Sequence, residues 1–150
     1  MEPIRKTLNK LKLIEKELFS LEPIFHHPEL GVSRENYSLM TTKEYWEIGA
    51  SGKRYSRDYI IDTLIERYSK PIIDNWRIED FYCQKIDTNT YLVTYDLYQG
   101  ERFTRRSTIW KKYKRNWKIV FHQGTEPPRD CRRPKCLRGY GHGQRKQIFT

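Results

Sequence analysis

The sequence predicts an α+β domain in which helices pack on one face of a curved antiparallel sheet. Two observations carry this prediction. Before Tyr68 most apolar residues recur at helical spacing, whereas from Trp76 to Thr125 they alternate with a period of two. Helices that precede an uninterrupted series of strands are typical of α+β domains. A sheet that curls around such helices leaves a cavity between the two layers, so the sequence also predicts a pocket.

The first predicted helix covers residues 4–21. Its apolar residues are separated by three or four positions, which places them on one stripe of a helix. They are Ile4, Leu8, Leu11, Ile14, Leu18 and Leu21. Ser33 is a favourable N-cap for a second helix over residues 34–41, and Ser56 is the N-cap of a third helix that runs to Tyr68.

Five strands are predicted. The first, Glu44–Ile48, lies between the second and third helices and owes its strand propensity to Tyr45, Trp46 and Ile48. The other four follow the third helix and are separated by short polar turns. They cover residues 78–86, 91–99, 102–110 and 117–125.

The strand pattern ends at Thr125, so we expect a domain at 1–125 and a basic, flexible tail at 126–150. The tail is rich in proline and glycine and carries about half of the net charge of +10. Such a tail can bind nucleic acid through its phosphates, although a solvated tail is the simpler interpretation.

The sequence shows neither a secretory apolar region nor a transmembrane run, and it contains three cysteines, an odd number. We therefore expect a cytoplasmic protein with reduced thiols that does not associate with membranes.

The order of elements, together with residues 22–27, 45–57 and 117–125, resembles the nuclear transport factor 2-like superfamily. Within it, the chain is similar to small bacterial proteins of the SnoaL-like branch and of branches of unknown function. The resemblance covers residues 8–125 and implies a cone-shaped antiparallel sheet wrapped around the N-terminal helices. Ketosteroid isomerases, dehydratases, epoxide hydrolases, polyketide cyclases and non-enzymatic transport domains share this fold, so the fold does not decide the function.

Enzymes of this superfamily place an acid–base residue in the cavity of the cone. The candidates here are Glu47, Asp96 and His122. A carboxylate inside an apolar cavity would have a raised pKa suited to proton transfer, whereas the alternative is a surface carboxylate paired with an arginine. Strand alternation puts His122 on one face of its strand and Ile119, Phe121 and Gln123 on the other. A hydrogen-bonded structural histidine is the alternative interpretation of His122.

Six residues are predicted to line the ligand pocket: Tyr45, Trp46, Tyr95, Thr108, Trp110 and Gln123. A tyrosine and aspartate pair at the positions used by ketosteroid isomerases is not identifiable, so that activity is not assigned.

Arg102, Arg105 and Arg106 make one strand rich in arginine. The outer sheet face often forms a dimer in this superfamily, so the resemblance implies a homodimer in which these arginines pair with acids of the partner. Binding of an anionic substrate by Arg105 or Arg106 is the alternative.

Two groups of residues have the chemistry of metal ligands. The first is His26, His27 and Glu29, and the second is Cys131, Cys136 and His142. Neither provides a complete ligand set, so we expect no metal and no cofactor.

These observations favour a small soluble homodimeric domain that holds a small apolar ligand in its cavity, without an assignable catalytic activity. The first alternative is an acid–base enzyme of the isomerase, dehydratase or cyclase type that acts on a small apolar molecule. The second is a protein that associates with nucleic acid through the basic tail.

Overall fold

The computed structural model describes residues 2–22, 28–69, 75–128 and 131. The helices are α1 (Lys12–Leu21), α2 (Arg34–Met40) and α3 (Arg57–Tyr68), with short 3-10 turns at Asn9–Leu11 and Pro28–Leu30. The strands are β1 (Thr41–Ile48), β2 (Arg54–Ser56), β3 (Trp76–Asp87), β4 (Thr90–Gln99), β5 (Arg102–Tyr113) and β6 (Asn116–Thr125). Apart from residues 126–128 and 131, the predicted tail lies outside the described residues, so its separation from the domain stays a prediction.

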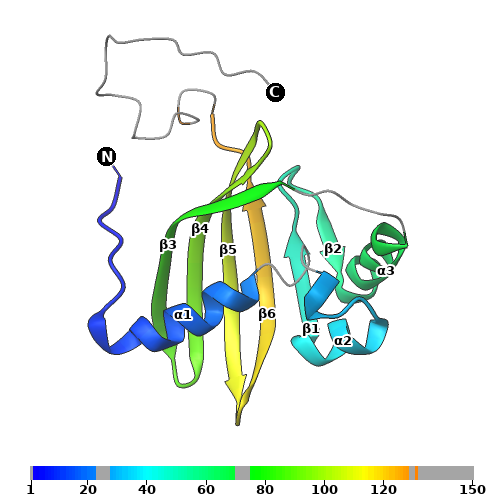
Figure 1. Cartoon of the computed structure of the whole chain (residues 1–150), viewed down its shortest axis with the longest axis horizontal. Helices are drawn as coiled ribbons and strands as arrows, with labels where there is room; N and C mark the ends of the chain where they lie inside the picture. Colours follow the sequence, from blue (N-terminus) through cyan, green and yellow to red (C-terminus); the bar gives the residue numbers. More distant parts are fainter. Residues whose placement is uncertain (1, 23–27, 70–74, 129–130, 132–150) are drawn as a thin grey trace, which may run out of the picture.

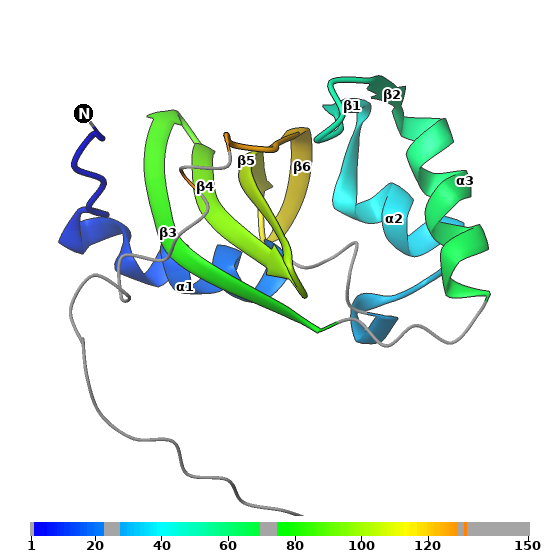
Figure 2. The same cartoon turned by 90° about the horizontal axis from the view of Figure 1, so that it is seen from above.

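The six strands form one curved sheet in the order β2-β1-β6-β5-β4-β3. The last four strands make the predicted antiparallel meander, whereas β1 joins β6 in parallel and β2 pairs with β1. Figure 1 shows α1 crossing the meander while α2 and α3 pack beside β1, and Figure 2 shows the curvature of the sheet. The predicted α+β architecture is therefore confirmed, with one parallel pair in an otherwise antiparallel sheet.

The core lies between the helices and the concave face of the sheet. Leu18 of α1 and Ile61 of α3 pack there with aromatic residues of the strands, including Tyr45, Tyr95 and Trp110. Each buried aromatic side chain removes roughly 150–250 Å² of surface from water, which explains how a chain with many charged residues still forms a core. No helix in the described part of the chain is long and apolar enough to cross a lipid bilayer.

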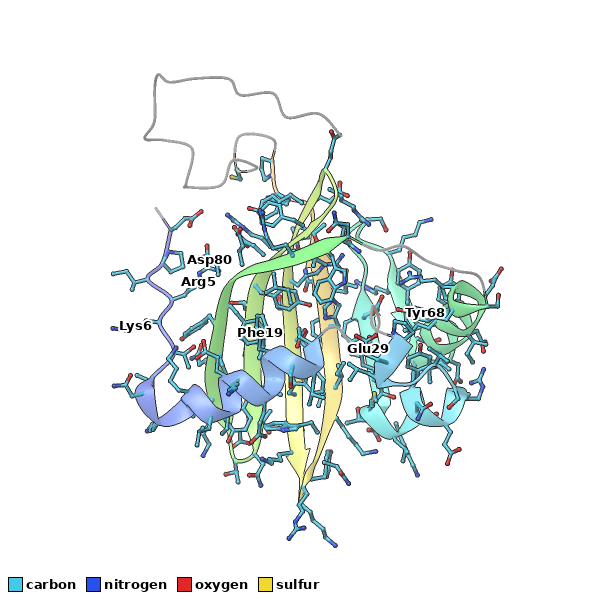
Figure 3. The ribbon with its side chains drawn as sticks, viewed as in Figure 1. Arg5, Lys6, Phe19, Glu29, Tyr68 and Asp80 are labelled. Carbon is cyan, nitrogen blue, oxygen red and sulfur yellow. The ribbon has the colours of Figure 1, made fainter. Side chains whose placement is uncertain are left out.

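Residues 4–8 are not helical, although their spacing continues the apolar stripe of α1. The Thr7 hydroxyl instead accepts a hydrogen bond from the backbone N–H of Cys83, at 2.9 Å, on the edge strand β3. Arg5 points toward Asp80, with 3.7 Å between guanidinium and carboxylate (Figure 3). These contacts hold the segment against an edge strand that would otherwise expose backbone groups, and tertiary contacts here override helical spacing.

A β-bulge in β6 changes which residues face the cavity. Ile109 pairs with Phe121, but the next residue of β5, Trp110, pairs with Ile119, so β6 contains one extra residue at Val120. Such a bulge shifts the alternation of side chains by one position. Ile119 is buried in the core, and His122 also faces inward. The prediction that these two residues lie on opposite faces is therefore wrong.

Candidate functional site

A cavity of about 540 Å³ lies between α3, the turn after β1 and the ends of β4, β5 and β6. Its charged lining consists of Glu47, Arg67, Arg102 and Arg106, and the His122 imidazole faces the same space. The apolar wall of the cavity is formed by Ile60 and Leu64 of α3 together with Tyr55 of β2. The cavity therefore combines an apolar wall with a cluster of cationic and titratable groups.

Glu22, the residue that follows α1, is buried in the core beside this cavity, with 5% of its surface exposed. Its carboxylate accepts hydrogen bonds from the Thr108 hydroxyl, from the Trp110 indole N–H at 2.6 Å, and from Tyr95. Burial raises the pKa of Glu22 to about 7, and the three hydrogen bonds oppose that rise. Glu22 can therefore exchange a proton near neutral pH.

Glu22 is not among the residues that the sequence predicted for the site, although one signal was available. Glu22 follows Leu18 by four positions, so it continues the apolar stripe of α1. A glutamate on the buried stripe of a helix indicates a carboxylate with partners in the core.

His122 is connected to Glu22 through Thr108. The Thr108 Oγ1 lies 2.8 Å from His122 Nδ1. A threonine hydroxyl has a single hydrogen, and Thr108 donates it to Glu22. When Glu22 is ionised, we therefore assign the proton of His122 to Nδ1, which leaves the lone pair of Nε2 facing Arg106, 3.5 Å away.

Arg106 is held against β6 at a glycine. Its Nε donates a hydrogen bond to the Thr104 hydroxyl at 2.9 Å, and its backbone pairs with Gly124. A Cβ atom at position 124 would lie 2.7 Å from Nη1 of Arg106. A side chain at position 124 would therefore displace the guanidinium from its present place. Burial lowers the pKa of Arg106, and the carboxylates of Glu47 and Glu22 act in the opposite direction.

Glu47 and Tyr45 project from β1 into the same region. The Tyr45 hydroxyl donates a hydrogen bond to Glu47 Oε2 at 2.7 Å. Burial raises the pKa of Glu47, while the Tyr45 hydrogen bond and the charges of Arg106 and Arg67 lower it. Glu47 is thus a second carboxylate that holds its proton more tightly than an exposed glutamate does.

Two of the three candidate acid–base residues, Glu47 and His122, lie together in the cavity. The third, Asp96, lies on the opposite face of β4, where Arg105 is its ion-pair partner at 3.7 Å. Arg105 also pairs with Glu2 at 3.0 Å. Burial is the main cause of the raised pKa of Asp96, but the strand alternation directs this carboxylate away from the cavity.

None of the six predicted pocket residues is among those that line the cavity. Tyr45, Tyr95, Thr108 and Trp110 are buried on the concave side, where they surround Glu22 and Glu47. Trp46 lies on the outer face and packs against Phe121, with ring centroids 4.7 Å apart. Gln123 follows the inward-facing His122 and therefore belongs to the outer face as well.

The candidate metal ligands are only partly described. His26, His27, Cys136 and His142 lie outside the described residues, and Cys131 is an exposed free cysteine. Among the residues that the structure places, no group of three histidine, cysteine or acidic side chains could hold a metal ion.

Comparison with known proteins gives a likeness in structure alone, because no protein-family model and no curated protein sequence matches the chain. A nuclear transport factor 2-like protein from Cytophaga hutchinsonii superposes with a TM-score of 0.61 at 16% identity, covering 80% of this chain and 100% of its own.

Two further solved structures give the same result. A candidate dehydratase of the nuclear transport factor 2-like family from Streptomyces avermitilis has a TM-score of 0.62 at 12% identity, covering 78% of this chain and 98% of its own. A candidate ketosteroid isomerase from Parabacteroides distasonis has a TM-score of 0.57 at 12% identity, covering 83% and 97%. The chain therefore has the nuclear transport factor 2-like fold.

Proposed function

We propose that this domain binds a small organic anion in the cavity, with Arg106 holding the carboxylate of the ligand. The observation that carries the proposal is the charge of the lining. Arg67, Arg102 and Arg106 face the cavity together with His122, and Glu47 is the one acidic residue among the described residues of the lining. Arg102 also pairs with Glu126 at 3.2 Å, so Arg67 and Arg106 are the cations that the proposal depends on. A partly desolvated guanidinium binds a carboxylate through paired hydrogen bonds. This lining favours an anion over the small apolar molecule that the sequence suggested.

The proposal is tested with pairs of ligands that share a shape and differ in charge, such as benzoate and benzamide, or phenylacetate and phenylacetamide. A cavity of this size accommodates molecules of these dimensions. Because a hydrogen bond to a charged group contributes about 1.5–3 kcal/mol, we expect each acid to bind roughly 10–100-fold more tightly than its amide in calorimetric titrations. Equal affinities within each pair would refute the proposal.

A second candidate function, acid–base catalysis on the bound anion, is supported by the Glu22–Thr108–His122 chain. The Thr108 hydroxyl holds Nδ1 of His122 as a proton donor, so the basic site of the imidazole is the lone pair of Nε2, which faces Arg106 at the cavity wall. The test uses the same cavity with 2-oxobutyrate in deuterium oxide. Loss of the C3 proton signal, followed by magnetic resonance, should be faster with the protein than in buffer. A rate equal to that in buffer would exclude this candidate.

We also propose that the domain forms a homodimer through the outer face of the sheet. The support is Trp46, whose side chain packs against Phe121 on that face and is 41% exposed. An exposed tryptophan on the outer face of a sheet is typical of an interface core. Sedimentation at micromolar concentration should give a dimer for the wild type and a monomer for Trp46→Glu. A monomeric wild type would contradict the proposal.

A further inference from the structure

The turn of the β5–β6 hairpin concentrates positive charge. Five of the eight residues of Lys111–Lys118 are basic and none is acidic. Figure 1 shows that this hairpin projects beyond the rest of the sheet, at the end opposite to the β4–β5 turn. The charge is therefore presented on a protruding element, away from the cavity beside α3.

Four of these cations have no acidic partner within the described part of the chain. Lys111 and Lys118 lie directly opposite each other on neighbouring strands, an arrangement in which like charges repel. Lys114 and Arg115 are exposed in the turn. The fifth cation, Lys112, does have an acidic partner, because it projects to the other face and pairs with Glu17 at 3.1 Å. The outer side of the hairpin thus carries uncompensated charge.

An aromatic ring lies among these cations. Tyr113 is 42% exposed, and the Lys111 ammonium lies over its ring at 5.4 Å from the centroid. Cations that contact phosphates beside an aromatic ring that stacks on bases are the combination by which proteins bind single-stranded nucleic acid. A membrane surface fits less well, because the tip, residues 114–116, has no apolar side chain to insert among lipids.

We infer that the outer side of the β5–β6 hairpin is a binding surface for single-stranded nucleic acid. Lys111, Lys114, Arg115 and Lys118 contact phosphates, and Tyr113 stacks on a base. None of these five residues lines the cavity beside α3.

In the test, the full-length protein is titrated into a labelled oligothymidylate, and binding is measured by fluorescence anisotropy. The oligonucleotide has about 20 nucleotides, which exceeds the site size of most single-strand binders. The hairpin variant carries Lys111→Gln, Lys114→Gln, Arg115→Gln and Lys118→Gln. Because this variant neutralises four fewer phosphates, it should bind more than 10-fold more weakly, and the slope of log affinity against log salt should decrease by roughly 2.8. A matched control removes the same charge from exposed residues elsewhere through Lys43→Gln, Lys53→Gln, Arg54→Gln and Lys85→Gln.

We expect the control variant to change the affinity less than about 3-fold, since its charges act only through the screened field. Tyr113→Ala should weaken binding by roughly 10-fold while leaving the salt slope unchanged, because stacking does not release counterions. Circular dichroism checks the fold of each variant. Equal weakening by the hairpin and control variants would overturn the inference, as would a wild type that does not bind the oligonucleotide. A hairpin variant that loses binding to phosphatidylserine vesicles but keeps the oligonucleotide would assign the surface to membranes instead.

Discussion

Between pH 5 and pH 8 the wild type is expected to lose about 2.5 kcal/mol of free energy of unfolding that the Glu22→Gln variant keeps. The pKa of Glu22 is about 7 in the folded protein, against 4.5 for an exposed glutamate. Between these two values the folded state binds the proton more tightly than the unfolded state does. The wild type therefore loses free energy of unfolding as the pH rises through this window, at about 1.4 kcal/mol for each pH unit. Glutamine does not ionise, so the variant avoids this loss.

Urea unfolding of both proteins between pH 5 and pH 8 measures the effect, because the difference between the two curves isolates residue 22. Glu17→Gln is the matched control. Glu17 also accepts a hydrogen bond from an indole N–H, that of Trp117 at 2.8 Å, but it lies at the surface. This hydrogen bond is the main cause of the lowered pKa of Glu17. At pH values above 5 the Glu17→Gln variant should therefore be slightly less stable than the wild type, which is opposite in sign to the effect of Glu22→Gln. Parallel curves for the wild type and Glu22→Gln would contradict the prediction.

The same replacement reverses the hydrogen-bond chain to His122. The Trp110 indole N–H can only donate, so it remains hydrogen-bonded to the oxygen of the glutamine amide. The amide NH₂ group then donates to the Thr108 hydroxyl. The Thr108 hydroxyl must in turn donate to His122 Nδ1, which moves the imidazole proton to Nε2 and sets it against the Arg106 guanidinium, also a donor, 3.5 Å away. A protonated Glu22 has the same consequence. The protonation state of Glu22 therefore determines whether Nε2 of His122 presents a lone pair or an N–H group on the side of Arg106 and the cavity.

The sequence predicted the elements better than the faces they present. Capping by Ser33 and Ser56 located α2 and α3, and the period of two located the meander, because these signals are local. His122 faces inward because β6 contains one extra residue relative to β5. Such a bulge is defined only by the pairing of the two strands, so it cannot be read from one strand alone. The strand β2 was not expected, since its three residues form a strand only by pairing with β1.

The site itself is assembled by tertiary structure. Glu22, Glu47, Arg106 and His122 come from the end of α1 and from three different strands. Periodicity could place each on a face of its own element, but it could not show that these faces meet. Glu22 was detectable as a charged residue on an apolar stripe, whereas its three hydrogen-bond donors come from β4 and β5, more than seventy residues away.

Arg105 and Arg106 are adjacent in the sequence and differ only in the face of β5 that they occupy. Arg106→Gln should weaken the binding of benzoate roughly 10–100-fold, because the variant lacks the charged donor that holds the carboxylate. Binding of benzamide should change little, since the amide does not use the positive charge. Calorimetric titration of both ligands measures the two effects.

Arg105→Gln provides the matched control, because it removes the same charge from the neighbouring position. Its guanidinium pairs with Glu2 and Asp96 on the outer face, so its loss should leave benzoate affinity within about 3-fold of the wild type, the size of a screened, long-range charge effect. If the cavity attracted anions only through the net charge of the protein, both variants would weaken binding equally. A selective effect at Arg106 therefore requires direct contact with the ligand, and equal effects would refute the assigned role of Arg106.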